Sequence, residues 1–397
     1  MGAKCMNIPA AIQQLHAEMR AWRHHLHSQP EIAYEEFATA DFVAAKLRAF
    51  GYIPHQGLGG TGVVASLTVG SRPKSIALRA DMDALLIDEA NTFTYRSQSP
   101  GKMHACGHDG HTTMLLGAAK YLAENPQFDG TVHFIFQPAE EGRAGALRML
   151  DEGLFRLFPT DSVYGLHNFP NVPTGHFAVK AGPMMAALNC FAIELHGTAC
   201  HATKPHLGHD PLVAAAHLVT ALQTIVSRNV DPHQSAVVSV TQLHSGNTWN
   251  AIPERVEIRG TYRCFQPSVQ VQLEQRMQQL TTSISSAFGV EGQIQFNPEN
   301  PGYPVTQNSP AEAEIAAKVA AAVVGADAVD LQPVPSMGSE DFAFMLQEKP
   351  GCYVWLGNGA AAGCGQLHNP HYDFNDDILP IGVAYWVKLV ETVLARG

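Results

Sequence analysis

The sequence predicts an α/β fold, in which a mostly parallel sheet is flanked by helices and a ferredoxin-like α+β domain is inserted. Two observations support this prediction. Short apolar segments bounded by Gly, Pro, Asp or Asn alternate with amphipathic segments in the first half of the chain, as the strands and helices of a parallel sheet do. The pattern changes near Gly182, and the next segments follow the order strand, helix, strand, strand, helix, strand.

The first predicted domain comprises residues 1–183 and 300–397. Gly51 directly follows an amphipathic segment and is a typical helix stop. The predicted strands are Gly62–Leu67, Ser75–Arg79, Thr131–Phe136, Asp161–Leu166 and Cys352–Leu356, and the predicted helices are Ala11–Ser28, Glu35–Phe50, Thr112–Glu124, Ala144–Glu152, Pro310–Val324 and Ile378–Ala395.

The second predicted domain, residues 184–299, is inserted into the first. Its predicted strands are Leu188–His196, Ala236–Leu243, Arg255–Tyr262 and Gly292–Phe296, and its predicted helices are Pro211–Val226 and Val269–Phe288. A proline-rich stretch, Asn297–Pro304, is the expected linker back to the first domain.

Composition narrows the classes of partner. The 397 residues carry a net charge of -11, which argues against nucleic acid or an anionic membrane surface as the main partner. No stretch is apolar and long enough to span a bilayer, and the first ten residues do not form a signal peptide. The seven scattered cysteines do not predict a disulfide framework. We therefore expect a cytoplasmic protein, and the net charge says little about a small substrate.

Histidine is abundant, with 20 residues, and one cluster at His104–His111 contains cysteine as well. Cys106 and His108 lie two positions apart before a predicted helix, and a thiolate and an imidazole at this spacing can reach one metal centre. The alternative is a histidine-rich helix start that is capped by Asp109.

Two adjacent carboxylates, Glu140 and Glu141, follow a predicted strand. One can bind a metal ion while the other acts as general base toward water. The alternative is an acidic first turn of a helix.

Three further polar residues also follow predicted strands, namely His167, His368 and Asp83. A carboxylate in the position of Asp83 can orient a ligand imidazole. A single histidine near a strand end is more often structural than a ligand. Because ligands of α/β sheets gather at the carboxyl ends of strands, the joint occurrence of these clusters predicts one site.

These motifs, in this order, resemble the aminoacylase and carboxypeptidase-like metallopeptidases. The resemblance is to the branch of hippurate hydrolases, bacterial N-acyl-amino-acid amidohydrolases and plant auxin-conjugate hydrolases, and it covers essentially the whole chain. The matching motifs are PEIAYEE at Pro30–Glu36, RADMDAL at Arg79–Leu85, HACGHDGH at His104–His111, FQPAEEG at Phe136–Gly142, GLHN at Gly165–Asn168, HATKPHLGHDP at His201–Pro211, NAIPE at Asn250–Glu254, GSEDFAFM at Gly338–Met345 and LHNPHYDFNDD at Leu367–Asp377.

The resemblance implies roles for individual residues. A two-metal site would have Cys106 as the bridging ligand, completed by His108, Glu141, His167 and His368. Glu140 would be the general base, and Asp83 would lie behind a ligand. From the inserted domain, which would serve as lid and dimerisation domain, His201 would stabilise the oxyanion, often across a dimer interface. Asn250 and Arg263 would contact the substrate carboxylate.

Two positions depart from the broader family. Asp81 stands where that family has histidine, and Cys106 stands where it usually has a bridging aspartate. Both changes are typical of the hippurate-hydrolase branch. A site of sulfur, nitrogen and oxygen donors accepts zinc or manganese, and also cobalt or nickel.

The predicted reaction is metal-dependent hydrolysis of the amide bond of an N-acylated amino acid, by a homodimer or larger homo-oligomer. Alternatives are a dipeptidase or carboxypeptidase activity, a hydrolase with Cys106 as covalent nucleophile, and a non-catalytic metabolite-binding protein. The acyl group and the amino acid are left open by the sequence.

Overall fold

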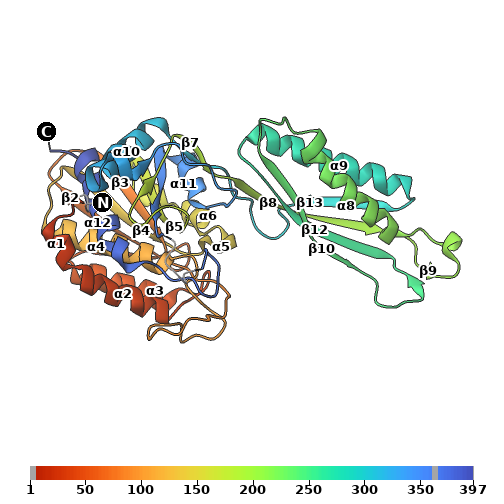
Figure 1. The fold of residues 1–397 in the computed structure, drawn as a ribbon, viewed down its shortest axis with the longest axis horizontal. Helices are drawn as coiled ribbons and strands as arrows, with labels where there is room; N and C mark the ends of the chain where they lie inside the picture. The colour runs from red at the N-terminus through yellow and green to blue at the C-terminus, as the bar shows by residue number, and fades with distance from the viewer. Residues whose placement is uncertain (1–5, 360–364, 397) are drawn as a thin grey trace. The chain divides into compact units, whose positions relative to one another are not determined.

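The computed structural model describes residues 6–359 and 365–396, and the chain divides into two compact units (Figure 1). Unit 1 comprises Met1–Met184, Thr306–Val334 and Asp341–Gly397, and unit 2 comprises Met185–Val305 and Pro335–Glu340. The sequence placed residues 300–305 and 335–340 in the first domain, so both boundaries differ. Backbone hydrogen bonds explain why residues 335–340 belong to unit 2, because the Ala186 N–H donates to the carbonyls of Ser336 and Gly338.

An eight-stranded mixed sheet forms the centre of unit 1, in the order β1-β2-β4-β3-β5-β16-β6-β15. The strands β4, β3, β5 and β16 run parallel, while β2 pairs antiparallel with both β1 and β4. The strand bounds are β1 His55–Leu58, β2 Gly62–Val69, β3 Ser75–Asp81, β4 Gly130–Gln137, β5 Ser162–Phe169, β6 Phe177–Ala178, β15 Val329–Asp330 and β16 Gly351–Gly357. A separate pair joins β7 Gly182–Met185 to β14 Thr306–Asn308.

Helices cover both faces of this sheet. The main apolar core lies on the face covered by α1 Ala10–Gln14, α2 His16–Ser28, α3 Phe37–Ala49, α4 His108–Glu124, α10 Pro310–Val324 and α12 Leu379–Val393. The other face packs against α6 Gly145–Asp151 and α11 Phe342–Glu348, and α7 Leu154–Leu157 packs beside α6. The predicted α/β fold class is confirmed.

Unit 2 has the ferredoxin-like arrangement that the sequence predicted. Its antiparallel sheet has the order β10-β12-β8-β13, and helices α8 and α9 pack on one face (Figure 1). The bounds are β8 Ala187–His196, α8 Pro211–Arg228, β10 Ala236–Ser245, β12 Arg255–Cys264, α9 Pro267–Ala287 and β13 Glu291–Phe296. A two-stranded ribbon joins β9 Cys200–His201 to β11 Ala251–Ile252. None of the helices in the described part of the chain combines the length and the apolar character needed to span a bilayer.

Candidate active site

The parallel strands of unit 1 bring the predicted site residues to one edge of the sheet. Because β3, β4 and β5 run in the same direction, their carboxyl ends lie next to each other. Asp81 ends β3, Glu140 follows β4, and His167 lies near the end of β5. Cys106 and His108 reach this edge from the start of α4.

Two histidines present one ring nitrogen each to the centre. His108 Nδ1 lies 3.3 Å from Asp83 Oδ1 and donates to it, since the carboxylate can only accept. His108 Nε2 is buried and has no hydrogen-bond partner among the described residues. His167 Nδ1 donates to the Asn168 carbonyl at 2.6 Å, and its Nε2 lies 3.4 Å from Cys106 Sγ. The Nδ1 contacts therefore leave the Nε2 atom of each ring to face a metal ion, which would displace any proton on it.

Glu141 links the remaining predicted ligands to these two. Its Oε1 lies 3.2 Å from His368 Nε2 and 4.0 Å from His108 Nε2. Ligand atoms of Cys106, His108 and Glu141 all lie within 4.8 Å of one another. The structure thus gathers every predicted metal ligand of unit 1 at one centre. His368 is its solvent-facing member, with a side chain that is 52% exposed.

The charges of the centre suit a cation. Burial, reinforced by the carboxylates of Glu141 and Glu140, raises the pKa of the Cys106 thiol well above its usual value. Burial opposes the charged form of His108, but Asp81 and Asp83 outweigh it and raise its pKa to about 10. A divalent ion among these donors would compensate the carboxylates and stabilise the thiolate, so the residues fit a metal. A nucleophilic cysteine needs a lowered thiol pKa, which this environment opposes.

Asp81, which the sequence analysis named only as a departure from the broader family, forms a support with His111, which it did not single out. His111 Nδ1 donates to Asp81 Oδ1 at 2.6 Å, and His111 Nε2 accepts the Asn168 N–H at 2.9 Å. Both nitrogens of His111 are therefore occupied, so His111 supports the centre and is not placed among its ligands. Arg79 holds the other oxygen of Asp81 at 2.7 Å. His111 and Asn168 belong to the motifs HACGHDGH and GLHN, but the motifs do not show that these two residues contact each other.

The two adjacent glutamates lie in a strained turn, residues 138–144, which we call the carboxylate turn. Ala139 and Ala144 have φ values of 56° and 54°, and Gly142 lies between them at 74°. Each non-glycine residue in this left-handed region costs about 1–2 kcal/mol. The Glu141 N–H donates to Asp83 Oδ2 at 2.9 Å, which links the turn to the carboxylate that orients His108. The alternative of a helix start with an acidic first turn is met only in part, because both glutamates lie in the first turn of the short helix α5, Glu140–Arg143, but Glu141 and Gly142 have non-helical dihedral angles.

The predicted site residues of unit 2 lie in two separate places. His201 pairs with Ala251 in the β9–β11 ribbon, and the Asn250 carbonyl accepts the Ala202 N–H at 2.9 Å, so His201 and Asn250 are neighbours. Arg263 lies near the end of β12, where its Nη1 donates to the Met337 carbonyl at 2.8 Å.

The distance between these places bears on how Asn250 and Arg263 could act together. Residues 255 and 263 of β12 are eight steps apart, which corresponds to about 26 Å at 3.3 Å per residue. The ribbon strand β11 comes just before Arg255, where β12 begins, and Arg263 lies near the other end of β12. Asn250 and Arg263 therefore flank opposite ends of β12.

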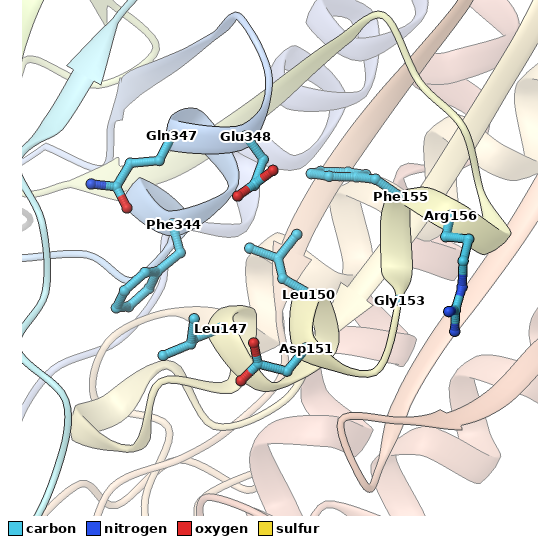
Figure 2. Close-up of a pocket in the computed structure, with 9 residues that line it drawn as sticks. All are labelled: Leu147, Leu150, Asp151, Gly153, Phe155, Arg156, Phe344, Gln347 and Glu348. Carbon is cyan, nitrogen blue, oxygen red and sulfur yellow. The ribbon is translucent and has the colours of Figure 1, made fainter.

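A surface cavity of about 300 Å³ lies elsewhere in unit 1 (Figure 2). Figure 2 shows it between α6, α7 and α11, with apolar side chains such as Leu147, Leu150 and Phe344 and with Arg156 and Glu348 among its polar residues. None of its lining residues belongs to the candidate metal centre. We therefore assign the chemistry to the sheet edge.

Fold and site together define an α/β protein with a candidate divalent-metal centre and an inserted ferredoxin-like unit. The model of Peptidase family M20/M25/M40 matches residues 77–392, and the chain belongs to this family.

The relatives agree with this assignment. The chain is 41% identical to a hippurate hydrolase of Campylobacter jejuni, over 97% of this chain and 98% of the relative. It is 40% identical to an N-acetyl-L-cysteine deacetylase of Bacillus subtilis, over 93% and 86% respectively. A solved Bacillus subtilis structure, described as a dinuclear metal binding peptidase from the M20 family, matches with a TM-score of 0.82 at 31% identity, over 96% and 99%. The resemblance drawn from the motifs is confirmed.

Proposed function

We propose that this protein hydrolyses the amide bond of N-acylated amino acids, which releases a carboxylic acid and a free amino acid. The observation that carries the proposal is the pair Glu140 and Glu141, because Glu141 lies among the donors Cys106 and His108 while its buried neighbour Glu140 is not a member of that group. The relatives support the substrate class, since hippurate and N-acetyl-L-cysteine are both N-acylated amino acids.

We infer that two divalent ions are required, zinc or manganese, with cobalt and nickel as alternatives. Cys106, His108, Glu141, His167 and His368 would hold them. When bound, the ions polarise the scissile carbonyl and increase the acidity of water. The mixed sulfur, nitrogen and oxygen donors support this choice of metals.

Glu140 is the proposed proton carrier. Its carboxylate accepts a proton from the attacking water as the new carbon–oxygen bond forms, and it gives that proton to the nitrogen as the carbon–nitrogen bond breaks. The Asp341 N–H, 3.3 Å from Glu140 Oε1, helps to hold the side chain in place.

His201 is the proposed oxyanion donor. Its Nδ1 lies 3.2 Å from the Thr203 N–H, which can only donate, so Nδ1 is the acceptor. The proton of the neutral ring is then on Nε2, and this N–H can donate to a developing oxyanion.

Release of free amino acid from a panel of N-benzoyl, N-acetyl and longer N-acyl amino acids tests the proposal. Turnover with one or more of them is expected, and the preferred compound identifies the acyl group. Dipeptides belong in the panel as well, because faster cleavage of dipeptides than of every N-acyl amino acid would favour the dipeptidase alternative. No release from any compound, in protein supplied with zinc or manganese, would refute the hydrolase assignment and favour the metabolite-binding alternative.

We further propose that the protein is a homodimer in which the His201 and Asn250 ribbon of one copy serves the centre of the other. The length of β12 supports the idea, since Arg255, next to the ribbon in sequence, and Arg263 are about 26 Å apart along the strand, which is more than a small substrate spans. Arg263 would then pair with the substrate carboxylate from the nearer copy.

Complementation between two inactive variants distinguishes a shared site from a self-contained one. Glu140→Gln and His201→Ala are each expected to be nearly inactive. After the two are mixed and their subunits exchanged, one site in four combines an intact Glu140 with an intact His201 from the other copy. About a quarter of wild-type activity should therefore return. A mixture that exchanges subunits, as shown by a tagged copy, and stays inactive would contradict the shared site.

A further inference from the structure

Glu36 is a fully buried carboxylate to which the proposed reaction gives no role. Its Oε1 accepts the Ala139 N–H at 2.8 Å, and its Oε2 accepts the Thr61 hydroxyl at 2.6 Å. Burial, together with the charge of Asp83, raises the pKa of Glu36 from 4.5 to about 7. The free energy of unfolding therefore falls as pH rises through about 7, where Glu36 ionises in the folded chain. The ionised carboxylate thus destabilises the folded chain near neutral pH.

Helix capping does not account for this carboxylate. Glu36 precedes α3, but its side chain makes no capping hydrogen bond. The free N–H groups of the first turn are satisfied by Glu31, whose oxygens accept from Ala38 at 3.1 Å and from Thr39 at 2.8 Å. The side chain of Glu36 is thus directed to the carboxylate turn.

The contact with Ala139 falls at the start of the carboxylate turn. Ala139 is the left-handed residue directly before Glu140, so its backbone sets the direction in which the two glutamates leave the strand. Near the other end of the turn, the Tyr34 hydroxyl donates to the Arg143 carbonyl at 2.9 Å. The segment Tyr34–Glu36 therefore contacts the carboxylate turn on both sides of the glutamates.

A further contact ties this segment to the metal-site framework. Ala84 donates its N–H to the Glu31 carbonyl at 2.8 Å, and Ile32 pairs with Ala84 in a parallel bridge. Ala84 directly follows Asp83, which orients His108 and accepts the Glu141 N–H. The loop before α3 thus connects the carboxylate turn with the end of β3.

We propose that Glu36 is a positioning residue, whose carboxylate fixes the left-handed backbone of Ala139 and so directs Glu140 to the substrate and Glu141 to the metal. The inference rests on the proposed function and adds a residue from outside the ligand and proton-transfer set. The essential property is an acceptor oxygen with the reach of a glutamate side chain.

Two variants separate reach from charge. Glu36→Gln keeps the length and an acceptor oxygen for Ala139 but has no charge, whereas Glu36→Asp keeps the charge but is one methylene too short to hold both Ala139 and Thr61. We expect Glu36→Asp to lower kcat about 10–100-fold with KM nearly unchanged, and Glu36→Gln to retain most of kcat. In the metal-free protein, the Kd for zinc, measured by competition with a chromophoric chelator, should rise about tenfold in Glu36→Asp and stay unchanged in Glu36→Gln.

Glu35→Gln is the matched control, because Glu35 is an exposed neighbour that pairs with Lys102 at 2.8 Å, and it should behave as wild type. A loss in Glu36→Gln as large as that in Glu36→Asp would show that charge matters, and wild-type kcat and zinc affinity in Glu36→Asp would show that reach does not matter. Either result overturns the inference. If wild type hydrolyses none of the N-acyl amino acids, the proposed function fails, while the zinc titration still decides the role of Glu36.

Discussion

Replacement of Glu140 by Gln is expected to lower kcat by about 10²–10⁴-fold, because the amide of glutamine cannot carry the proton from water to the leaving nitrogen. Glutamine has nearly the same shape as glutamate and fits the buried position of Glu140. Glu141 keeps its contacts with His368 and His108. Metal content, measured by elemental analysis, should therefore equal that of wild type. The rate of amino-acid release under saturating substrate provides kcat.

Two comparisons make this result specific. Glu141→Gln should lose metal affinity as well as turnover, since Glu141 lies among the donors. Glu348→Gln changes an exposed carboxylate in the cavity of Figure 2 and should behave as wild type. If Glu140→Gln kept near-normal kcat, the assignment of the general base would be wrong.

Removal of the metal is expected to reduce turnover to the uncatalysed level, and addition of zinc or manganese should restore it. The physical reason is the composition of the centre, in which a buried thiol and carboxylates surround imidazoles whose Nε2 atoms face inward. Without a cation, no group there can polarise the scissile carbonyl strongly. The measurement is amino-acid release by protein treated with a chelator and dialysed, before and after addition of each metal.

The same experiment distinguishes the role of Cys106. If Cys106 is a metal ligand, the protein should lose its activity when the metal is removed. Cys106→Ser should then bind zinc more weakly than wild type, because hydroxyl is a poorer zinc donor than thiolate. As a covalent nucleophile, Cys106 would remain active after chelation. Full turnover in verified metal-free protein would therefore refute the metal-dependent mechanism and support the nucleophile.

The sequence predicted most elements because their signals are local. Helix α10, Pro310–Val324, has the predicted bounds, and β3 was predicted at Ser75–Arg79 and observed at Ser75–Asp81. The short strands β1, β6 and β15 were missed, since a few residues carry no periodic pattern. The antiparallel pairing of β2 with β4 also lies outside any local pattern, because register and direction depend on residues far along the chain.

The residues of the candidate site also divide into those that local motifs predict and those that depend on contacts between distant residues. Cys106, His108 and Glu141 were named from motif and spacing, and the structure brings them together. The role of His111 could not be predicted, because its two nitrogens are satisfied by Asp81 and Asn168 from different strands. Glu36 escaped notice because its partner Ala139 lies 103 positions away.

By itself, the sequence determined the fold class, the order of the elements and the chemical groups of the candidate centre, because residue type, periodicity and motif spacing are local properties. Only the tertiary structure decided which ring nitrogens are free, how the carboxylate turn is held, and that Arg263 lies far from the His201 ribbon. These features depend on strand order and on contacts between distant residues, where hydrogen-bond geometry over a few ångströms determines what each group can do.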